Sequence, residues 1–405
     1  MSPGDESAQP SRGRVAWIDA ARGFLVVLVV LGHTLYFMRM GGMPFPELEP
    51  AVRVAQAIRI PALFALSGAL FLHAASRSWR TVIGTRIVPM AWVLGVWLLV
   101  ELVVRSWRFS VATTLPDGVA AWALEQALLP EDYLWFIWAL AVMTLMARLL
   151  RSYPVLIVAV ALAMLLSPEL PNLGRQTVPL FTYAPFFLIG FLVAPALRVR
   201  QRWLVVLGAI SALCFIPLAI ARNEFDLVLT NNRTDVVLLA LLGLTAVALV
   251  GIGLSRIPGF ALWSWLGRRT LPIYVAHMPL LLVGLWLVEG PARAFAEPRP
   301  GVVVLLLLVY AVGVPVLLRV VCDKLPFDGI LAEPRWLRRL VLGDGGGGAS
   351  ARSARTEAAA PDDASGAPEA VEPPAPEDAS GAHSPADPPD AADRAARERR
   401  GSSSG

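Results

Sequence analysis

The chain of 405 residues has little charge and few of the side chains that most often hold metal ions. Charged residues make up 16% of it, and it has four histidines and two cysteines. Cys214 and Cys322 lie far apart without metal-ligand spacing, so we interpret them as small core residues and predict no metal site. The small basic excess, a net charge of +4, reflects membrane topology and does not indicate nucleic-acid binding.

Hydrophobic residues are abundant, at 56% of the sequence, and the mean hydropathy of +0.61 is far above that of soluble proteins. Apolar runs long enough to cross about 30 Å of hydrocarbon recur along most of the chain. We therefore predict an all-α fold, a polytopic membrane helical bundle of about ten transmembrane helices in the plasma membrane. The predicted spans are residues 18–38, 54–74, 87–105, 133–150, 153–167, 178–197, 202–221, 235–254, 270–289 and 301–321.

Basic residues set the predicted orientation, because Lys and Arg beside a span tend to stay cytoplasmic. With ten spans, most arginines that flank the spans fall on one side, and the opposite loops carry fewer arginines and several Asp and Glu. Both termini are therefore expected to be cytoplasmic. The first apolar run is too long for a cleavable signal peptide, so we expect it to act as an uncleaved first span.

Four segments are expected along the chain. Residues 1–13 are polar, residues 14–322 form the membrane domain, and residues 323–342 form a short basic segment beside the membrane. Residues 343–405 are rich in Gly, Ala, Pro, Ser, Asp and Glu, so we expect a disordered cytoplasmic tail. No loop between the spans is long enough to fold separately, so any chemistry must be done by the membrane domain.

Arg22 and His33 are the most informative polar residues of the first apolar run, and ten residues separate them. Eleven helical steps bring His33 to within roughly 20° of Arg22 and about 16 Å along the axis. Asp19 lies within about 60° of His33, on a stripe that must face protein or water. We expect Arg22 near the cytoplasmic interface and His33 past the midplane, where burial favours a neutral imidazole that can accept a proton. Two structural roles stay open: His33 bonded to a backbone carbonyl, and Arg22 paired with Asp19.

Arginines gather at the predicted cytoplasmic ends of two spans. Arg77, Arg80 and Arg86 lie around the start of the third span, and Arg268 and Arg269 precede the ninth. Arg77, Arg80 and Arg86 either keep their end of the spans on the cytoplasmic side or bind the phosphates of a cytosolic nucleotide-like donor.

Two groups near the predicted outer face have both a functional and a structural interpretation. Asp132 and Trp135 offer a carboxylate and a stacking face, as sugar-binding sites do, or are ordinary interface residues. Glu101 is another candidate for acceptor binding, although it can pair with Arg105 one helical turn on.

Two further motifs lie within the spans. Ser67 and Gly68 form either part of a site or a small-residue packing notch. Tyr274 and His277 are one turn apart and therefore share a helix face. A histidine inside a membrane is costly unless it is paired, so His277 is a candidate site residue with a structural alternative.

Five short motifs follow one another from Trp17 to about Val321: Asp19-Ala-Ala-Arg22-Gly with Gly32-His33, Pro61-Ala-Leu-Phe64 to Ser67-Gly68, Leu134-Trp135-Phe136, Phe186-Phe187-Leu188-Ile189-Gly190, and Ile273-Tyr274 to His277. In this order they resemble the acyltransferase 3 family of integral-membrane acyltransferases, especially its fucose 4-O-acetylase-like branch. The most specific element is the arginine, ten residues and histidine of the first span.

The resemblance implies transfer of an acyl group, most often acetyl, to a hydroxyl of an extracytoplasmic or membrane-presented carbohydrate or glycolipid. Acetyl-CoA or another acyl-CoA would be the donor substrate, with no bound cofactor. His33 would be the general base, with Arg22 on the donor side and Asp19 beside it. The candidate donor-binding residues are Arg77, Arg80, Arg86, Arg268 and Arg269, and the candidate acceptor-binding residues are Trp135, Asp132, Glu101, Ser67, Tyr274 and His277.

Two positions depart from the family pattern. Ile83 stands where an arginine would complete the family's Arg-x-x-Arg with Arg86. Arg59 lies two residues before Pro61, in a region where acetylase-like members often carry a histidine.

Two other functions stay open. In a transporter or flippase, Asp19, Arg22 and His33 would line a polar pathway through the membrane. In the third hypothesis the protein is a catalytically silent partner that organises glycan assembly.

Overall fold

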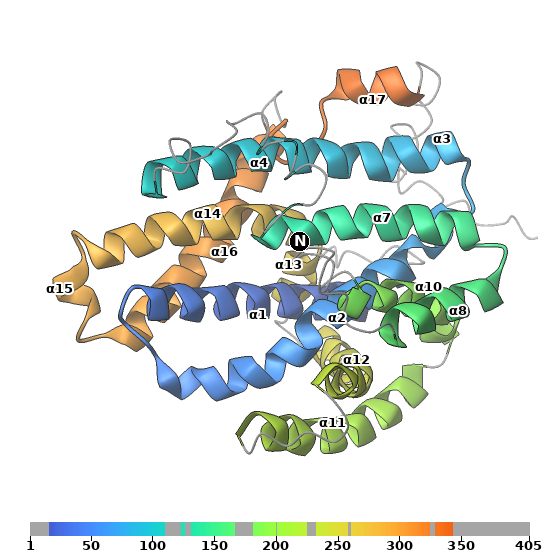
Figure 1. The fold of residues 1–405 in the computed structure, drawn as a ribbon, viewed down its shortest axis with the longest axis horizontal. Coiled ribbons are helices and arrows are strands. Elements are labelled where there is room, and N and C mark those ends of the chain that lie inside the picture. Colours follow the sequence, from blue (N-terminus) through green and yellow to red (C-terminus); the bar gives the residue numbers. More distant parts are fainter. Residues whose placement is uncertain are drawn as a thin grey trace, which may run out of the picture. The chain divides into compact units, whose positions relative to one another are not determined.

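The computed structural model describes residues 16–109, 122, 124, 126, 130, 132–166, 181–199, 201–224, 232–257, 261–324 and 329–342. Within these ranges every regular element is a helix, which confirms the predicted all-α fold (Figure 1). The predicted segments 1–13 and 343–405 lie outside the described residues. The helices are α1 (Ala16–Met40), α2 (Glu49–Ala75), α3 (Trp79–Val82), α4 (Val88–Phe109), α7 (Trp135–Leu150), α8 (Pro154–Leu166), α10 (Pro185–Val199), α11 (Gln201–Glu224), α12 (Asn232–Arg256), α13 (Ala261–Gly267), α14 (Thr270–Glu289), α15 (Arg293–Ala296), α16 (Pro300–Lys324) and α17 (Arg335–Leu342), with the short turns η1 (Pro46–Leu48) and η3 (Asp132–Leu134) and the π-helix η2 (Ile83–Ile87).

Seven of the described helical segments are long and apolar enough to cross a membrane: Ala16–Met40, Pro46–Ala75, Trp79–Arg108, Arg202–Asn223, Asp235–Arg256, Thr270–Glu289 and Pro300–Cys322. The protein is therefore a polytopic membrane protein. Three predicted spans coincide with shorter apolar helices, Trp135–Leu150, Pro154–Leu166 and Phe181–Leu197. The exact number of crossings and the side of each terminus stay predictions.

Helix α1 lies at the centre of the bundle, where it contacts α2, α12, α13, α14 and α16. More than half of its residues are buried, including Asp19, which is 4% exposed, and Thr34, which is fully covered. The stripe that carries Arg22 and His33 is therefore enclosed by protein, as the cost of placing ionisable groups against lipid requires.

Helices α2 and α10 pack almost backbone to backbone through two glycines. A Cβ placed on Gly68 would lie 1.9 Å from the carbonyl oxygen of Phe187, and one on Gly190 would lie 1.9 Å from that of Ala65. Close helix approach through small residues is common in membranes, because van der Waals packing and not the hydrophobic effect drives association there. This contact fixes α10 against the middle of α2.

The segment 329–342 packs against the third predicted span. The indole N–H groups of Trp92 and Trp97 donate to the carbonyl oxygens of Gly329 and Ile330 at 2.7 and 2.9 Å. Arg80 donates from Nε to the carbonyl of Val341 at 2.9 Å, and α17 contacts α3 and η2 (Figure 1). The predicted basic segment is thus fastened to the bundle along its helix.

Candidate functional site

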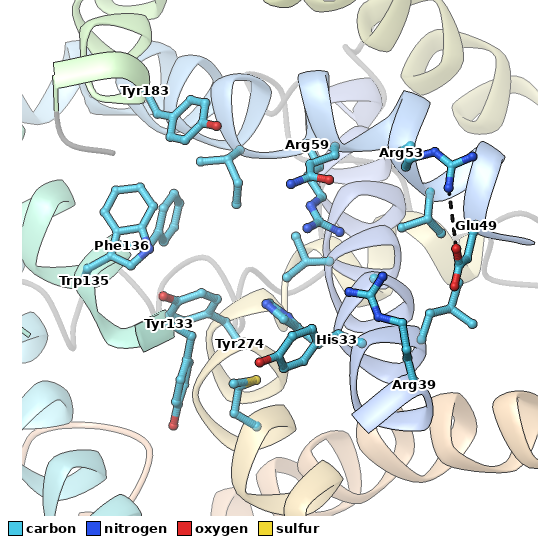
Figure 2. A pocket seen from close by; sticks show the side chains of 18 residues that line it. His33, Arg39, Glu49, Arg53, Arg59, Tyr133, Trp135, Phe136, Tyr183 and Tyr274 are labelled. Atoms are coloured by element: carbon cyan, nitrogen blue, oxygen red, sulfur yellow. Dashed lines mark hydrogen bonds and ion pairs between the residues drawn. The ribbon is translucent and has the colours of Figure 1, made fainter. Parts of the chain in front are cut away.

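A cavity of about 540 Å³ lies inside the bundle, beside α1 and α2. Its walls come from these two helices, α14, the turn η3 with the start of α7, and the residues just before α10 (Figure 2). The volume lies within the range of small-molecule sites. One part of the lining is aromatic and another part is basic, and His33 lies between them.

His33 is half-buried in the wall of the cavity. On the side away from the cavity its ring contacts a second histidine, His277. Nε2 of His277 lies 3.1 Å from Nδ1 of His33, and Nδ1 of His277 lies 2.6 Å from the carbonyl oxygen of Tyr274. His277 is fully covered by the surrounding protein. The pair joins α1 to α14 across 244 positions of sequence and so has a structural role as well.

Hydrogen-bond chemistry fixes the tautomers of a neutral pair. The carbonyl of Tyr274 can only accept, so Nδ1 of His277 must carry the hydrogen of that bond. Nε2 of His277 is then an acceptor, and Nδ1 of His33 donates to it. A neutral His33 that donates from Nδ1 has an unprotonated Nε2, which is the nitrogen able to take a proton.

Aromatic side chains line much of the cavity, and Trp135, Phe136 and Tyr183 lie across from His33 in the close view (Figure 2). Trp135 and Tyr183 lie with their ring centres 6.3 Å apart, and Phe136 and Tyr274 lie 5.2 Å apart. The hydroxyl of Tyr133 donates to the carbonyl of Val275 at 2.9 Å, which ties the turn η3 to α14. Flat apolar faces beside polar groups suit the rings of carbohydrates.

Basic side chains line the part of the cavity near the α1–α2 connection. Arg39 is near the end of α1, Arg53 is near the start of α2, and Arg59 lies nearly two helical turns further along α2. Glu49 is the carboxylate among the described lining residues, and it pairs with Arg53 at 3.5 Å. In the predicted topology this is the outer end of the bundle.

Arg22 lies three helical turns from His33 and outside the described lining of the cavity. It is half-buried, and its Nη2 donates to the hydroxyl of Thr270 at 2.8 Å, at the start of α14. Asp19, one turn before Arg22, has its backbone carbonyl against Gly267 at the end of α13. The structure thus separates the ionisable stripe of α1 into a cavity end with His33 and an opposite end with Arg22.

The five predicted donor-binding arginines lie outside the described lining of the cavity. Arg77, Arg80 and Arg86 are exposed, and Arg86 lies on the π-helix η2. Arg268 is exposed and Arg269 is half-buried with its guanidinium 4.3 Å above the ring of Trp265. Their role in donor binding stays a prediction.

The remaining predicted acceptor residues fall in different places. Trp135 and Tyr274 line the cavity, whereas His277 lies behind His33. Ser67 donates to the carbonyl of Leu63 at 2.7 Å, one turn back on its own helix.

Glu101 and Asp132 complete the predicted set. Glu101 is buried and accepts from Nε of Arg105 at 2.7 Å, the pairing that their spacing predicts. Asp132 begins the turn η3, and its side chain is outside the described residues.

Sequence reasoning did not assign Arg39, Arg53, Tyr133 or Tyr183 to the site. Arg59 was noted only as a departure from a family pattern, although an arginine within an apolar span is itself a signal of a site. The direct partner of His33 was not identified either, because no periodicity relates residues on two different helices.

The fold and the cavity together define a polytopic membrane protein with a polar site inside its helical bundle. The family model of acyltransferase 3, described as an acyltransferase domain, matches residues 15–320, and the chain therefore belongs to the acyltransferase 3 family. The family resemblance inferred from the motifs is confirmed.

Two curated proteins with similar sequences are both named nodulation protein NolL. The one from Mesorhizobium japonicum is 28% identical over 213 residues, which are 49% of this chain and 55% of the relative. The one from Sinorhizobium fredii is 27% identical over 246 residues, which are 57% of this chain and 66% of the relative. The matches span from about half to about two thirds of these relatives. No solved structure matches the chain.

Proposed function

We propose that this protein is an O-acyltransferase of the plasma membrane that moves an acyl group, acetyl in the simplest case, from acyl-CoA to a hydroxyl of a cell-envelope carbohydrate. Family membership supports acyl transfer as the reaction class. The observation that carries the proposal is the arrangement of His33, which lines a cavity while His277 occupies its Nδ1.

In this reaction the acceptor hydroxyl attacks the thioester carbonyl carbon, and its proton passes to Nε2 of His33. The tetrahedral intermediate then collapses, the carbon–sulfur bond breaks, and the CoA thiolate takes the proton from the imidazolium. An ester and free CoA result. General-base catalysis of this kind contributes about 10² to 10⁴ in rate.

The two ends of the α1 stripe suit the two substrates. The acceptor would enter the cavity among the aromatic and basic residues, near the α1–α2 connection. The thioester would approach His33 from the end that holds Arg22 and Thr270, which is the cytoplasmic end in the predicted topology. Arg22 would then contact the donor or position the helix end that does.

The test is an assay on sealed membrane vesicles that contain the protein. Labelled acetyl-CoA and envelope glycan are supplied, and label that becomes alkali-labile on the glycan measures ester formation. We expect label transfer that depends on the protein. Movement of glycan across the vesicle membrane without any acyl donor, together with no ester formation, would contradict the proposal and favour a transporter.

A further inference from the structure

The charges in the cavity limit the chemical class of the acceptor. Arg39, Arg53 and Arg59 line the cavity, and Glu49 is the carboxylate among the described lining residues. Glu49 is already engaged by Arg53, one helical turn away. The described lining therefore has an excess of positive charge, even when His33 is counted as neutral.

Arg59 is half-buried in the cavity wall, and its hydrogen bonding is incomplete. It lies within an apolar span of α2, and its Nη1 makes only a long hydrogen bond, 3.4 Å, to the carbonyl of Leu28. Its buried Nε has no hydrogen-bond partner, and no ion pair found among the described residues includes it. A guanidinium inside a membrane bundle is costly unless an anion pairs with it, so a ligand is expected to supply that anion.

Gly32 leaves room for this guanidinium beside the proposed base. A Cβ at Gly32 would lie 1.9 Å from Nη1 of Arg59, so any other residue there would displace it. Gly32 directly precedes His33 in α1, and both residues line the cavity with Arg59. An anion held by Arg59 is therefore held next to His33.

We propose that the acceptor is an anionic carbohydrate, a sugar that carries a carboxylate or a phosphate, and that Arg59 binds this anionic group. The inference rests on the proposed function, because it takes the cavity as the acceptor site. Arg39 and Arg53 attract the anion at the α1–α2 end, and Trp135 and Tyr183 offer faces to the sugar ring. Arginine suits this role, since its planar guanidinium binds carboxylate or phosphate oxygens in pairs.

The test measures binding without any acyl transfer. Purified protein in detergent is titrated with methyl glucuronide, glucose 1-phosphate and the neutral methyl glucoside. We expect an anionic probe to bind about tenfold or more tightly than the neutral one, as an added charged hydrogen-bond pair predicts. Arg59→Gln should remove this preference and Arg59→Lys should keep part of it. Arg293→Gln, which removes an exposed arginine of α15 outside the cavity lining, should leave it unchanged.

Each of the following results would overturn the inference. Equal affinity for the neutral and anionic probes, or no binding of either anionic probe, means that the cavity does not select an anion. Binding of coenzyme A that is lost in Arg59→Gln, with no binding of either sugar anion, would assign the cavity arginines to the donor. Slower ester formation by Arg59→Gln with unchanged probe affinity shows that Arg59 acts on the reacting carbonyl instead. Thermal unfolding of each variant checks its fold, and if Arg59→Gln is unstable, a partial loss of the preference in Arg59→Lys is the expected result and an unchanged preference contradicts the inference. Ester formation on a neutral glycan would leave the proposed function intact while refuting this inference.

Discussion

His277 gives the most informative perturbation, because it touches His33 and lies outside the described lining of the cavity. In His277→Leu the acceptor at 3.1 Å from Nδ1 of His33 is lost, while the buried volume is roughly kept. His33 then loses its side-chain partner, and its backbone hydrogen bond with Val29 alone is left to orient the ring. A hydrogen bond to a group that becomes charged is worth about 1.5–3 kcal/mol, which corresponds to about 10- to 100-fold in rate. We expect kcat to fall by this factor with little change in either KM.

The control for this prediction is His277→Gln, whose amide oxygen can reach the position of Nε2 and accept from His33. It should recover most of the lost kcat in the labelled acetyl-CoA assay. A merely structural role would make the two variants differ only in thermal stability. Equal kcat values for His277→Leu and His277→Gln, with both proteins folded, would refute the reasoning.

Two further predictions concern packing and acceptor binding. Gly68→Ala places a methyl group 1.9 Å from the carbonyl of Phe187, so it should destabilise the α2–α10 contact by about 1–3 kcal/mol or more and lower the unfolding temperature in detergent. An unchanged unfolding temperature would show that α10 moves freely away from α2. Trp135→Ala removes a stacking face worth about 0.5–1.5 kcal/mol, so the KM for the glycan should rise roughly two- to tenfold while that for acyl-CoA stays constant. A rise in the acyl-CoA KM alone would place Trp135 on the donor side.

The sequence predicts the helical class well because long apolar runs have few alternatives in a membrane. The spacing of Arg22 and His33 also places them on one enclosed stripe of α1, as the helical period requires. The pairing of Glu101 with Arg105 follows from the same period.

Contacts between distant segments were not predictable in this way. His277 is 244 positions from His33, and only the packing of α14 on α1 brings their rings together. Gly32 and Arg59 meet for the same kind of reason, through the approach of α1 and α2. A single sequence carries no period that links two helices, so such pairs emerge only from the fold.

The role of His33 as the base is the central claim, and the rate of ester formation in His33→Ala tests it most directly. His73→Ala is the matched control, since His73 is exposed on α2 and lies outside the described lining of the cavity. Both variants are compared with the wild type in vesicles that contain equal amounts of folded protein. The account predicts a loss of about 10² to 10⁴ in kcat for His33→Ala and an unchanged rate for His73→Ala. Ester formation at the wild-type rate by His33→Ala would contradict it.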